Sequence, residues 1–331
     1  MHVYTPPSTA KTIPVIDLKG SFSELLEDRK AVAWEVHKAA RDTGFFYIKN
    51  HGVSTDVMDG QLDVARQFFA LSQSEKLQID ARNSECMRGY EAMAIQVLDD
   101  GSQPDLKEGF MAGRDLGPGH PYVVNKVPYH GPNQWLADKK WLRHSTERYI
   151  ETMRALGTHL AGILALSLDL PEAYFGKGCD EPMVTTRLLH YPPQMGVGEG
   201  NQLGAGAHTD WGLLTILMQD DVGGLEVQNA DGDWVNAPPI PDTFVINLGD
   251  MVPVLTNGLY HSNMHRVFNR SPEKHRYSVP TFFDLDYFYR IKAVPTLKSA
   301  ENSVEVTVGE HIANMYRKTY ALESRALATV Q

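Results

Sequence analysis

Hydrophobic and polar positions follow two different periods along the chain. In residues 23–40 and 58–71, apolar side chains recur at close to helical spacing, and Gly44 follows the first of these segments as a stop signal. Short apolar runs at residues 13–18 and 45–48 predict buried strands. We therefore expect the opening third of the chain to be an α/β region.

The middle and the end of the chain have different patterns. Residues 84–133 are rich in Gly, Pro and Asp with little periodicity, which predicts loops, whereas residues 135–170 keep helical spacing up to Pro171. Short apolar runs separated by turn residues then predict strands at 185–191, 212–218, 224–228, 242–248 and 277–283. Several short strands with regular turns favour a sandwich or barrel over a parallel sheet.

These patterns divide the chain into four predicted segments. They are an N-terminal α/β region (1–130), a helical segment (131–182), a β-rich core (183–290) and a C-terminal tail packed on that core (291–331). The predicted fold class is thus mainly β with flanking helices.

Composition narrows the choice of partners and compartment. A formal net charge of −10 over 331 residues argues against a nucleic-acid partner. No apolar run approaches the roughly 20 residues that span a bilayer, and no signal peptide is apparent at the start. Cys86 and Cys179 are isolated, so they predict neither a disulfide framework nor a thiolate metal site. We expect a cytoplasmic protein, a monomer or weak dimer, with no membrane partner.

One triplet in the β-rich segment carries metal-binding chemistry. His208 and Asp210 are two residues apart, which places both side chains on one face of a strand, whereas on a helix they would diverge by roughly 200°. The apolar, β-branched run at residues 213–218 favours a strand. Because the chain has 13 histidines, about one His-x-Asp is expected by chance, so the neighbouring motifs decide its meaning.

A third ligand follows later in the same segment. His265 comes 55 residues after Asp210 (265 − 210), enough for several strands and a return to the same end of a barrel. Two neutral imidazoles and one carboxylate leave positions open on an octahedral metal, as in the facial triad of non-haem Fe(II) oxygenases. We therefore predict that His208, Asp210 and His265 are the metal ligands and the catalytic centre.

An arginine and a serine lie close behind this set. Arg276 and Ser278 are two residues apart on an otherwise apolar predicted strand, so they share one of its faces. A guanidinium beside a hydroxyl suits a carboxylate, and a buried arginine needs an anionic partner. That partner is either an internal Asp or Glu or an incoming dicarboxylate.

With these residues in place, the chain resembles the iron(II)/2-oxoglutarate-dependent dioxygenases of the isopenicillin N synthase-like family. The resemblance covers nearly the whole sequence and depends on motifs in a fixed order. They are Ile13-Pro14-Val15-Ile16-Asp17-Leu18, residues 44–53, Phe68-Phe69-Ala70-Leu71, Arg88-Gly89-Tyr90, residues 105–110, His208-Thr209-Asp210, Asn247-Leu248-Gly249-Asp250, residues 262–267 and Arg276-Tyr277-Ser278.

The resemblance implies a double-stranded β-helix, or jelly roll, with Fe(II) near one mouth. It implies that Arg276 and Ser278 hold the distal carboxylate of the cosubstrate 2-oxoglutarate and that Tyr191 lies near that molecule. Dioxygen is the second cosubstrate. One departure concerns the near carboxylate, because Leu189 stands where many relatives have Asn.

The implied reaction is oxidation of a small molecule, most commonly hydroxylation, with release of succinate and CO2. Two alternatives stay open at this point. One is an isopenicillin N synthase-like oxidase that uses no 2-oxoglutarate; a tail glutamine near the metal in that enzyme would correspond to Gln331. The other is a non-catalytic small-molecule binder on the same scaffold. Succinate formation from 2-oxoglutarate separates the three.

The primary substrate is set by loops, which vary freely on a fixed scaffold. We expect Arg88, Tyr90 and Phe110 from the middle segment, with Phe283 from the core, to form the wall that faces the metal. The alternative for Tyr90 and Phe110 is that they only pack the two halves of the protein together. Arg88 lies in an otherwise uncharged stretch and favours a substrate with an anionic group.

Overall fold

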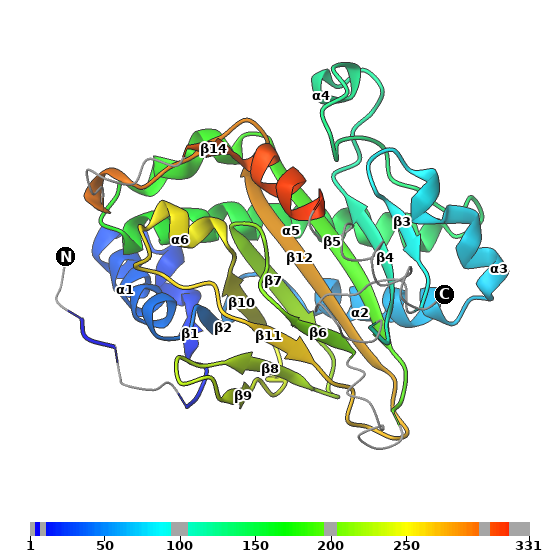
Figure 1. Cartoon of the computed structure of the whole chain (residues 1–331), viewed down its shortest axis with the longest axis horizontal. Coiled ribbons are helices and arrows are strands. Elements are labelled where there is room, and N and C mark those ends of the chain that lie inside the picture. The colour runs from blue at the N-terminus through cyan, green and yellow to red at the C-terminus, as the bar shows by residue number, and fades with distance from the viewer. Residues whose placement is uncertain (1–3, 7–10, 94–104, 195–203, 298–304, 318–331) are drawn as a thin grey trace.

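Two mainly antiparallel β-sheets face each other, and a layer of helices covers the outer side of the larger one (Figure 1). The computed structural model describes residues 4–6, 11–93, 105–194, 204–297 and 305–317. The large sheet has the order β1-β2-β10-β7-β12-β5-β4-β3, and only the pair β1–β2 is parallel. Its strands are β1 (Val15–Asp17), β2 (Phe45–Lys49), β3 (Gly89–Glu91), β4 (Glu108–Gly113), β5 (Pro182–Tyr191), β7 (Leu214–Gln219), β10 (Phe244–Leu248) and β12 (Arg276–Asp286).

The small sheet lies across the inner face of the large one. Its order is β6-β11-β8-β9, with β6 (Ala205–His208), β8 (Leu225–Gln228), β9 (Trp234–Asn236) and β11 (His265–Val267). A further pair, β13 (Arg290–Ile291) and β14 (Val306–Thr307), forms a separate ribbon. The predicted fold class, a jelly roll with flanking helices, is confirmed.

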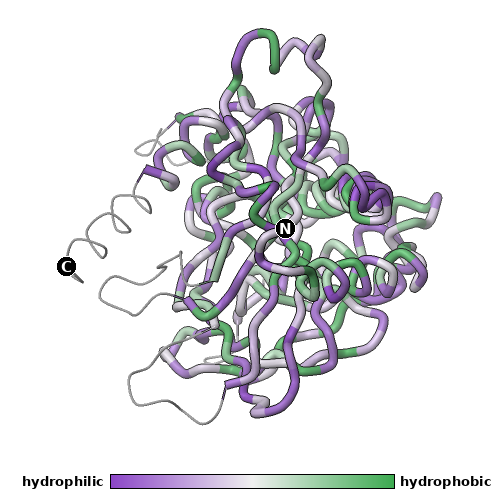
Figure 2. The backbone as a smooth tube through the Cα atoms, turned by 90° about the vertical axis from the view of Figure 1, so that its right-hand side faces the viewer, coloured by the Kyte–Doolittle hydropathy of each residue, from purple (hydrophilic) through white to green (hydrophobic). Residues whose placement is uncertain are grey.

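Three long helices pack behind the large sheet: α1 (Leu26–Asp42), α2 (Thr55–Phe69) and α5 (Lys140–Ser167). Along them, hydrophilic and hydrophobic stretches alternate within the turns, as expected of helices with one buried side (Figure 2). The short helices are α3 (Gln73–Lys76), α4 (Pro121–Val124) and α6 (Met251–Leu255). Short 3-10 segments lie at Leu18–Phe22, Leu77–Ile79, Ala81–Asn83, Glu172–Cys179 and Pro295–Leu297. Residues 308–317 are also helical.

Side-chain alternation along the central strands creates two cores. Alternate residues of β5 and β12, such as Leu188 and Phe283, point outward into the cluster that joins the sheet to the helices. The intervening residues point inward, where Leu189 and Tyr191 pack with Val227 of the small sheet. The inner face is only partly filled by apolar side chains, which leaves room for a cavity between the sheets.

The predicted loop region contains two strands that the sequence pattern did not indicate. Residues 84–133 include β3 and β4, and every residue of β4 is buried. Their composition hides them, because β4 has Gly109 and Gly113 within its six residues and begins with a charged Glu108. The long helix also begins later than expected, at Lys140 instead of residue 135.

The large sheet draws strands from both ends of the chain. β1 to β4 come from the predicted N-terminal region, and β5, β7, β10 and β12 come from the β-rich segment or its border. The four-segment division is not tested by this arrangement and stays a prediction. None of the helices in the described part of the chain combines the length and apolar character that a bilayer span requires.

A buried polar network on the outer face joins the sheet to α3. Glu108 accepts hydrogen bonds from Lys76 Nζ (2.7 Å) and from the Tyr90 hydroxyl, and it contacts His190 Nδ1 at 2.8 Å. Burial raises the pKa of the Glu108 carboxyl, but His190, Lys76 and Tyr90 outweigh that effect and bring the pKa down to about 2. The charged form of Glu108 therefore stabilises the fold.

We expect Glu108→Gln to lower the free energy of unfolding by about 3–5 kcal/mol at neutral pH, because Lys76 loses its buried partner. The pKa of Glu108 is lowered on folding from 4.5 to about 2, so its contribution is present above pH 4.5 and is lost as pH falls towards 2. Urea unfolding between pH 7 and pH 3 measures this. A variant that loses as much stability as the wild type over that pH range would contradict the assignment.

Candidate functional site

A cavity of about 240 Å³ lies between the two sheets. Its floor is the inner face of the large sheet, to which β12 contributes Arg276, Ser278, Pro280, Phe282 and Asp284. The adjacent β5 contributes Met183, Thr185, Arg187, Leu189 and Tyr191. Both sets alternate strictly along their strands, as the two-residue period of a strand requires.

His208, Asp210 and His265 meet at one side of this cavity. Nε2 of His208 lies 3.9 Å and Nε2 of His265 lies 3.8 Å from Oδ1 of Asp210. One ligand atom from each of the three residues lies within 4.8 Å of the others. His208 ends β6 and His265 begins β11, and the two residues are directly paired across the small sheet. The predicted ligand set is therefore brought together.

Hydrogen bonds orient both histidines for metal binding. Nδ1 of His208 lies 2.7 Å from the Gly206 carbonyl, and Nδ1 of His265 lies 3.3 Å from the Asn263 carbonyl. Since a carbonyl only accepts, each Nδ1 carries the proton, which leaves Nε2 of the neutral ring with a free lone pair. Those two Nε2 atoms face Asp210.

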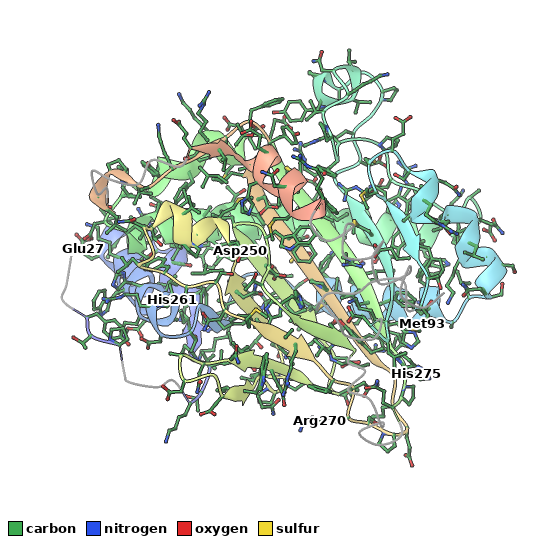
Figure 3. The ribbon with its side chains drawn as sticks, viewed as in Figure 1. Glu27, Met93, Asp250, His261, Arg270 and His275 are labelled. Atoms are coloured by element: carbon green, nitrogen blue, oxygen red, sulfur yellow. The ribbon has the colours of Figure 1, made fainter. Side chains whose placement is uncertain are left out.

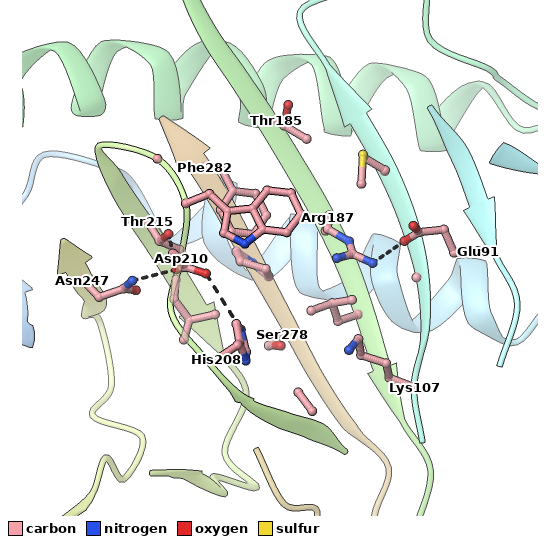
Figure 4. Close-up of a pocket in the computed structure, with 18 of the residues that line it drawn as sticks. Glu91, Lys107, Thr185, Arg187, His208, Asp210, Thr215, Asn247, Ser278 and Phe282 are labelled. Atoms are coloured by element: carbon pink, nitrogen blue, oxygen red, sulfur yellow. Dashed lines mark hydrogen bonds and ion pairs between the residues drawn. The ribbon is translucent and has the colours of Figure 1, made fainter. Parts of the chain in front are cut away.

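The carboxylate is held in place through its other oxygen. Asn247 Nδ2 donates to Oδ2 of Asp210 at 2.7 Å, and the Thr215 hydroxyl donates to the same atom. Figure 4 shows Asp210 between Asn247 and His208, with Thr215 beside it. Oδ1 is thereby left facing the histidines, so the arrangement presents one oxygen and two nitrogens to a common point.

The pKa values of His208 and Asp210 are both shifted in directions that suit metal binding. Burial lowers the pKa of His208, and repulsion from His265 lowers it further, so that the ring stays neutral. Burial raises the pKa of Asp210, but His265, His208 and the hydrogen bonds from Asn247 and Thr215 outweigh it and keep that pKa below its usual value. A neutral His208 ring beside an ionised Asp210 carboxylate suits a divalent metal, which binds deprotonated ligands.

The segment that carries Asp210 is fixed by Asp250 at the start of α6. The Asp250 carboxylate accepts hydrogen bonds from Thr209 (3.0 Å) and Ser262 (2.7 Å), and its backbone N–H donates to the Asp210 carbonyl at 2.8 Å. Asp250 and His261 lie on neighbouring segments near α6 in Figure 3. Asp250 therefore connects the segments that lead to all three candidate ligands.

His208 and Asp210 do not share one face of a strand, contrary to the prediction from their spacing. Strand β6 ends at His208, and Asp210 lies in the turn that follows, before β7 begins at Leu214. The two side chains converge because the turn is held by Asp250, Asn247 and Thr215, and not because they share a strand face.

Arg276, Ser278 and Tyr191 form a second group at the far end of β12. Arg276 is 1% exposed, its Nη1 lies 3.1 Å from the Ser278 hydroxyl, and its guanidinium lies 4.8 Å from the centre of the Tyr191 ring. Its Nε donates to the Gly223 carbonyl at 2.5 Å. Within the described part of the chain, no carboxylate lies within the 4.0 Å of an ion pair with Arg276. Of the two alternatives for its partner, the described residues thus favour an incoming anion.

Burial raises the pKa of Tyr191, while Arg276 and a hydrogen bond with Ser278 act in the opposite direction. The Tyr191 hydroxyl thus stays protonated and can donate to an acidic ligand. Leu189 lines the same floor, between Arg187 and Tyr191 on β5, so it offers only apolar contact there.

Of the four residues expected to form the substrate wall, only Arg88 lines the cavity. Tyr90 and Phe110 pair across β3 and β4 and point to the outer face, where both pack against Phe68 of α2. Phe283 is fully buried against α5, where a Cβ on Gly157 would lie 2.2 Å from its ring. The expected placement of these three aromatic residues on the wall is thus corrected: they belong to the helix-facing core.

The alternation of side chains along β12 distinguishes the cavity-facing residues from those that face the helices. Arg276 and Ser278 face the cavity, so the even-numbered residues of β12 must do so, which selects Phe282 and Asp284 instead of Phe283. On β4, Gly109 and Met111 line the cavity and Phe110 does not, but this parity is known only from the pairing of β4 with β5. Asn247 and Thr215, which orient Asp210, give no such signal because their contacts depend on the tertiary fold.

Two more charged pairs and one lone carboxyl complete the lining. Arg187 pairs with Glu91, as Figure 4 shows, and Lys107 pairs with Asp105. Burial raises the pKa of Asp284 to about 7, and burial also lowers the pKa of Arg88, which the Cys86 thiol and Tyr316 partly offset.

Comparison with known families agrees with these observations. Residues 13–138 match the family described as non-haem dioxygenase in morphine synthesis, N-terminal, and residues 179–285 match the 2OG-Fe(II) oxygenase superfamily. The second match contains all three candidate ligands together with Arg276 and Ser278.

Individual relatives cover nearly the whole chain. A 2-oxoglutarate-Fe(II) type oxidoreductase of Emericella nidulans is 34% identical, over 93% of this chain and 90% of the relative. A homoarginine-6-hydroxylase of Arabidopsis thaliana is 33% identical, over 93% and 89% respectively. Among solved structures, a full-length Neurospora crassa protein in complex with alpha-KG and thymine superimposes with a TM-score of 0.78 and 27% identity, covering 96% of this chain and 97% of that one.

Phe282 and Phe283 lie on opposite faces of β12, so their replacement should cost different amounts of stability. We expect Phe283→Ala to lower the free energy of unfolding by about 3–5 kcal/mol, because it empties a closed core site. We expect Phe282→Ala to lower it by about half as much or less, because that ring lines a cavity. Chemical denaturation of both variants measures the difference, and equal losses would contradict the assigned faces.

Proposed function

The chain belongs to the 2OG-Fe(II) oxygenase superfamily, and on this basis we propose that His208, Asp210 and His265 bind its Fe(II). The protein is accordingly a non-haem, 2-oxoglutarate-dependent dioxygenase that acts on a small molecule. The observation that carries the residue assignment is the convergence of two unprotonated Nε2 atoms and one free carboxylate oxygen on a single point. Two nitrogens and one oxygen are a donor set that suits Fe(II) and leaves positions open for other ligands.

We assign the distal carboxylate of 2-oxoglutarate to Arg276 and Ser278, with Tyr191 beside it. A buried guanidinium without a described carboxylate partner and an adjacent hydroxyl support this placement. When bound, Fe(II) and 2-oxoglutarate supply dioxygen activation coupled to oxidative decarboxylation, which yields succinate and CO2 and oxidises the substrate.

The chain's own residues have three tasks in that reaction. The triad presents its donor atoms in orientations fixed by hydrogen bonds, and Arg276 with Ser278 orients the cosubstrate along β12. The apolar residues of the cavity, such as Leu189, exclude water from the reacting groups. We infer hydroxylation as the outcome, since this is the commonest result of such an arrangement.

The relatives' names do not define one substrate class. Homoarginine and thymine, which two of those names contain, differ in charge and shape. Gln331, the residue considered for the oxidase alternative, lies outside the described residues. The cytoplasmic location, the lack of a nucleic-acid partner and the monomer or weak dimer stay predictions; the free thiols of Cys86 and Cys179 suit a reducing compartment.

Replacing Asp210 by Ala should abolish both turnover and stable iron binding, because it removes the only anionic ligand. Iron content after anaerobic loading and succinate formation are the two measurements. Asp221→Ala serves as the control, because Asp221 is an exposed aspartate whose side chain is 80% accessible. An Asp210→Ala protein with near-normal iron content and activity would rule out the ligand assignment.

Replacing Arg276 by Leu should weaken 2-oxoglutarate binding by at least about 10-fold while iron content is retained, because a buried carboxylate partner is lost. Anaerobic calorimetry on the iron-loaded protein measures the affinity, and Arg154→Leu on the exposed side of α5 is the matched control. If the wild-type iron protein shows no 2-oxoglutarate binding at all, the oxidase alternative is favoured instead.

A further inference from the structure

A buried guanidinium and a buried carboxyl face the cavity without an ionic partner in the described part of the chain. Arg88 and Asp284 are each 6% exposed, and both line the cavity. Among the described residues, neither lies within 4.0 Å of an oppositely charged group. Two other cations that line the cavity do have ionic partners, Arg187 in Glu91 and Lys107 in Asp105.

The guanidinium of Arg88 is fixed by neutral groups. Nη1 donates to the Thr185 hydroxyl at 3.0 Å and Nη2 donates to the Tyr129 carbonyl at 3.3 Å, while Nε is buried without a hydrogen-bond partner. Gly113 makes room for this group, since a Cβ there would lie 2.2 Å from Nη2. A buried cation of this kind is costly unless an anion accompanies it, and a guanidinium matches carboxylate geometry.

The carboxyl of Asp284 is fixed in a similar way. Oδ1 accepts the Leu213 N–H at 2.7 Å, and a Cβ on Gly212 would lie 1.8 Å from that oxygen. In the part of the chain that the structure describes, Oδ2 of Asp284 has no hydrogen-bond donor. The group is therefore a fixed acceptor on the cavity wall.

The two groups occupy the same end of the cavity. Thr185, the partner of Arg88, pairs with Phe282, and Asp284 pairs with Met183 on the same two strands. Thr185 and Asp284 are thus diagonal neighbours, about 7–8 Å apart. Ser278 lies six residues (284 − 278) before Asp284 on β12, about 20 Å away at about 3.3 Å per residue.

Asp210 is anchored at the level of this end, on the other side of β12. It accepts a hydrogen bond from Thr215, and Thr215 pairs with Phe282 from β7, as Thr185 does from β5. A molecule held by Arg88 and Asp284 would therefore lie beside the candidate metal ligands and away from Arg276.

We propose that Arg88 and Asp284 determine substrate specificity, and that the substrate is a dipolar small molecule with an anionic group for Arg88 and an ammonium or N–H donor for Asp284. This inference rests on the proposed function, which supplies the reaction at the metal position. The apolar body of such a molecule would contact Phe282 and Met111, which lie on the same floor. The rival reading is purely structural, with Arg88 tying Tyr129 to the sheet and Asp284 tying the turn at Leu213.

A charge-matched panel separates these readings. The probes are ω-aminohexanoate, hexanoate, hexylamine and hexanol, and the same four classes on a ring: para-(aminomethyl)benzoate, para-methylbenzoate, para-methylbenzylamine and para-methylbenzyl alcohol. Binding is measured by anaerobic calorimetry on the iron- and 2-oxoglutarate-loaded wild type, and turnover is measured as stimulated succinate formation. We expect the dipolar member of at least one series to bind about 10-fold or more tightly than its three counterparts. Dipolar probes that bind no better than the other classes in both series would overturn the proposal.

Two charge-removing variants show which residue is responsible for each part of the preference. Asp284→Asn keeps an acceptor for the Leu213 N–H but removes the charge, and should reduce the preference for the dipolar probe over the plain carboxylate by about 10-fold. Arg88→Gln should likewise reduce the preference for the dipolar probe over the plain amine by about 10-fold. Glu151→Gln and Arg154→Gln, an exposed pair on α5, are the controls.

The outcomes are distinguishable from failure of the proposed function. Thermal unfolding shows whether each variant is folded. If a variant is not folded, the probe panel on the wild type still tests the proposed substrate class. Wild-type 2-oxoglutarate binding tests the function separately. If the wild type binds 2-oxoglutarate but the folded variants keep the wild-type preference for dipolar probes, the specificity assignment fails and the dioxygenase assignment stands.

Discussion

The two-residue period of the central strands is the constraint on which this architecture depends. On β5 and β12 one set of alternate side chains packs against the helices, and the other set faces the small sheet. A shift of one residue in either strand would exchange the two sets, moving Phe283 into the cavity and Arg276 into the apolar core. The packing of Phe283 against Gly157 therefore fixes the register that also places Arg276 and Ser278.

The convergence of the three candidate ligands depends on contacts from both sheets. His208 and His265 are held by strand pairing in the small sheet, but Asp210 is held by hydrogen bonds from Asn247 on β10 and Thr215 on β7. The small sheet thus carries the two candidate histidines, and the large sheet holds the turn that carries Asp210. Asp250 links them, because it binds Thr209, Ser262 and the backbone of Asp210.

Much of this site could be predicted from the sequence, and the reasons differ by residue. The triad and the pair Arg276–Ser278 were recognisable because their spacing and order form motifs. Tyr90, Phe110 and Phe283 were misplaced, since aromatic character alone does not say which face of a strand is buried; parity with Ser278 would have excluded Phe283. Strand β4 was missed because glycines and a charged residue conceal it. Asn247 and Asp284 act through contacts that only the tertiary fold creates.

The central claim is that a single Fe(II) is bound by Nε2 of His208, Nε2 of His265 and Oδ1 of Asp210. Anomalous scattering at the iron edge, from crystals loaded with Fe(II) and 2-oxoglutarate under anaerobic conditions, tests it most directly. The account predicts one peak about 2 Å from each of these three atoms, with the distal carboxylate of 2-oxoglutarate against Arg276. A peak elsewhere, or coordination through either Nδ1 atom, would contradict it.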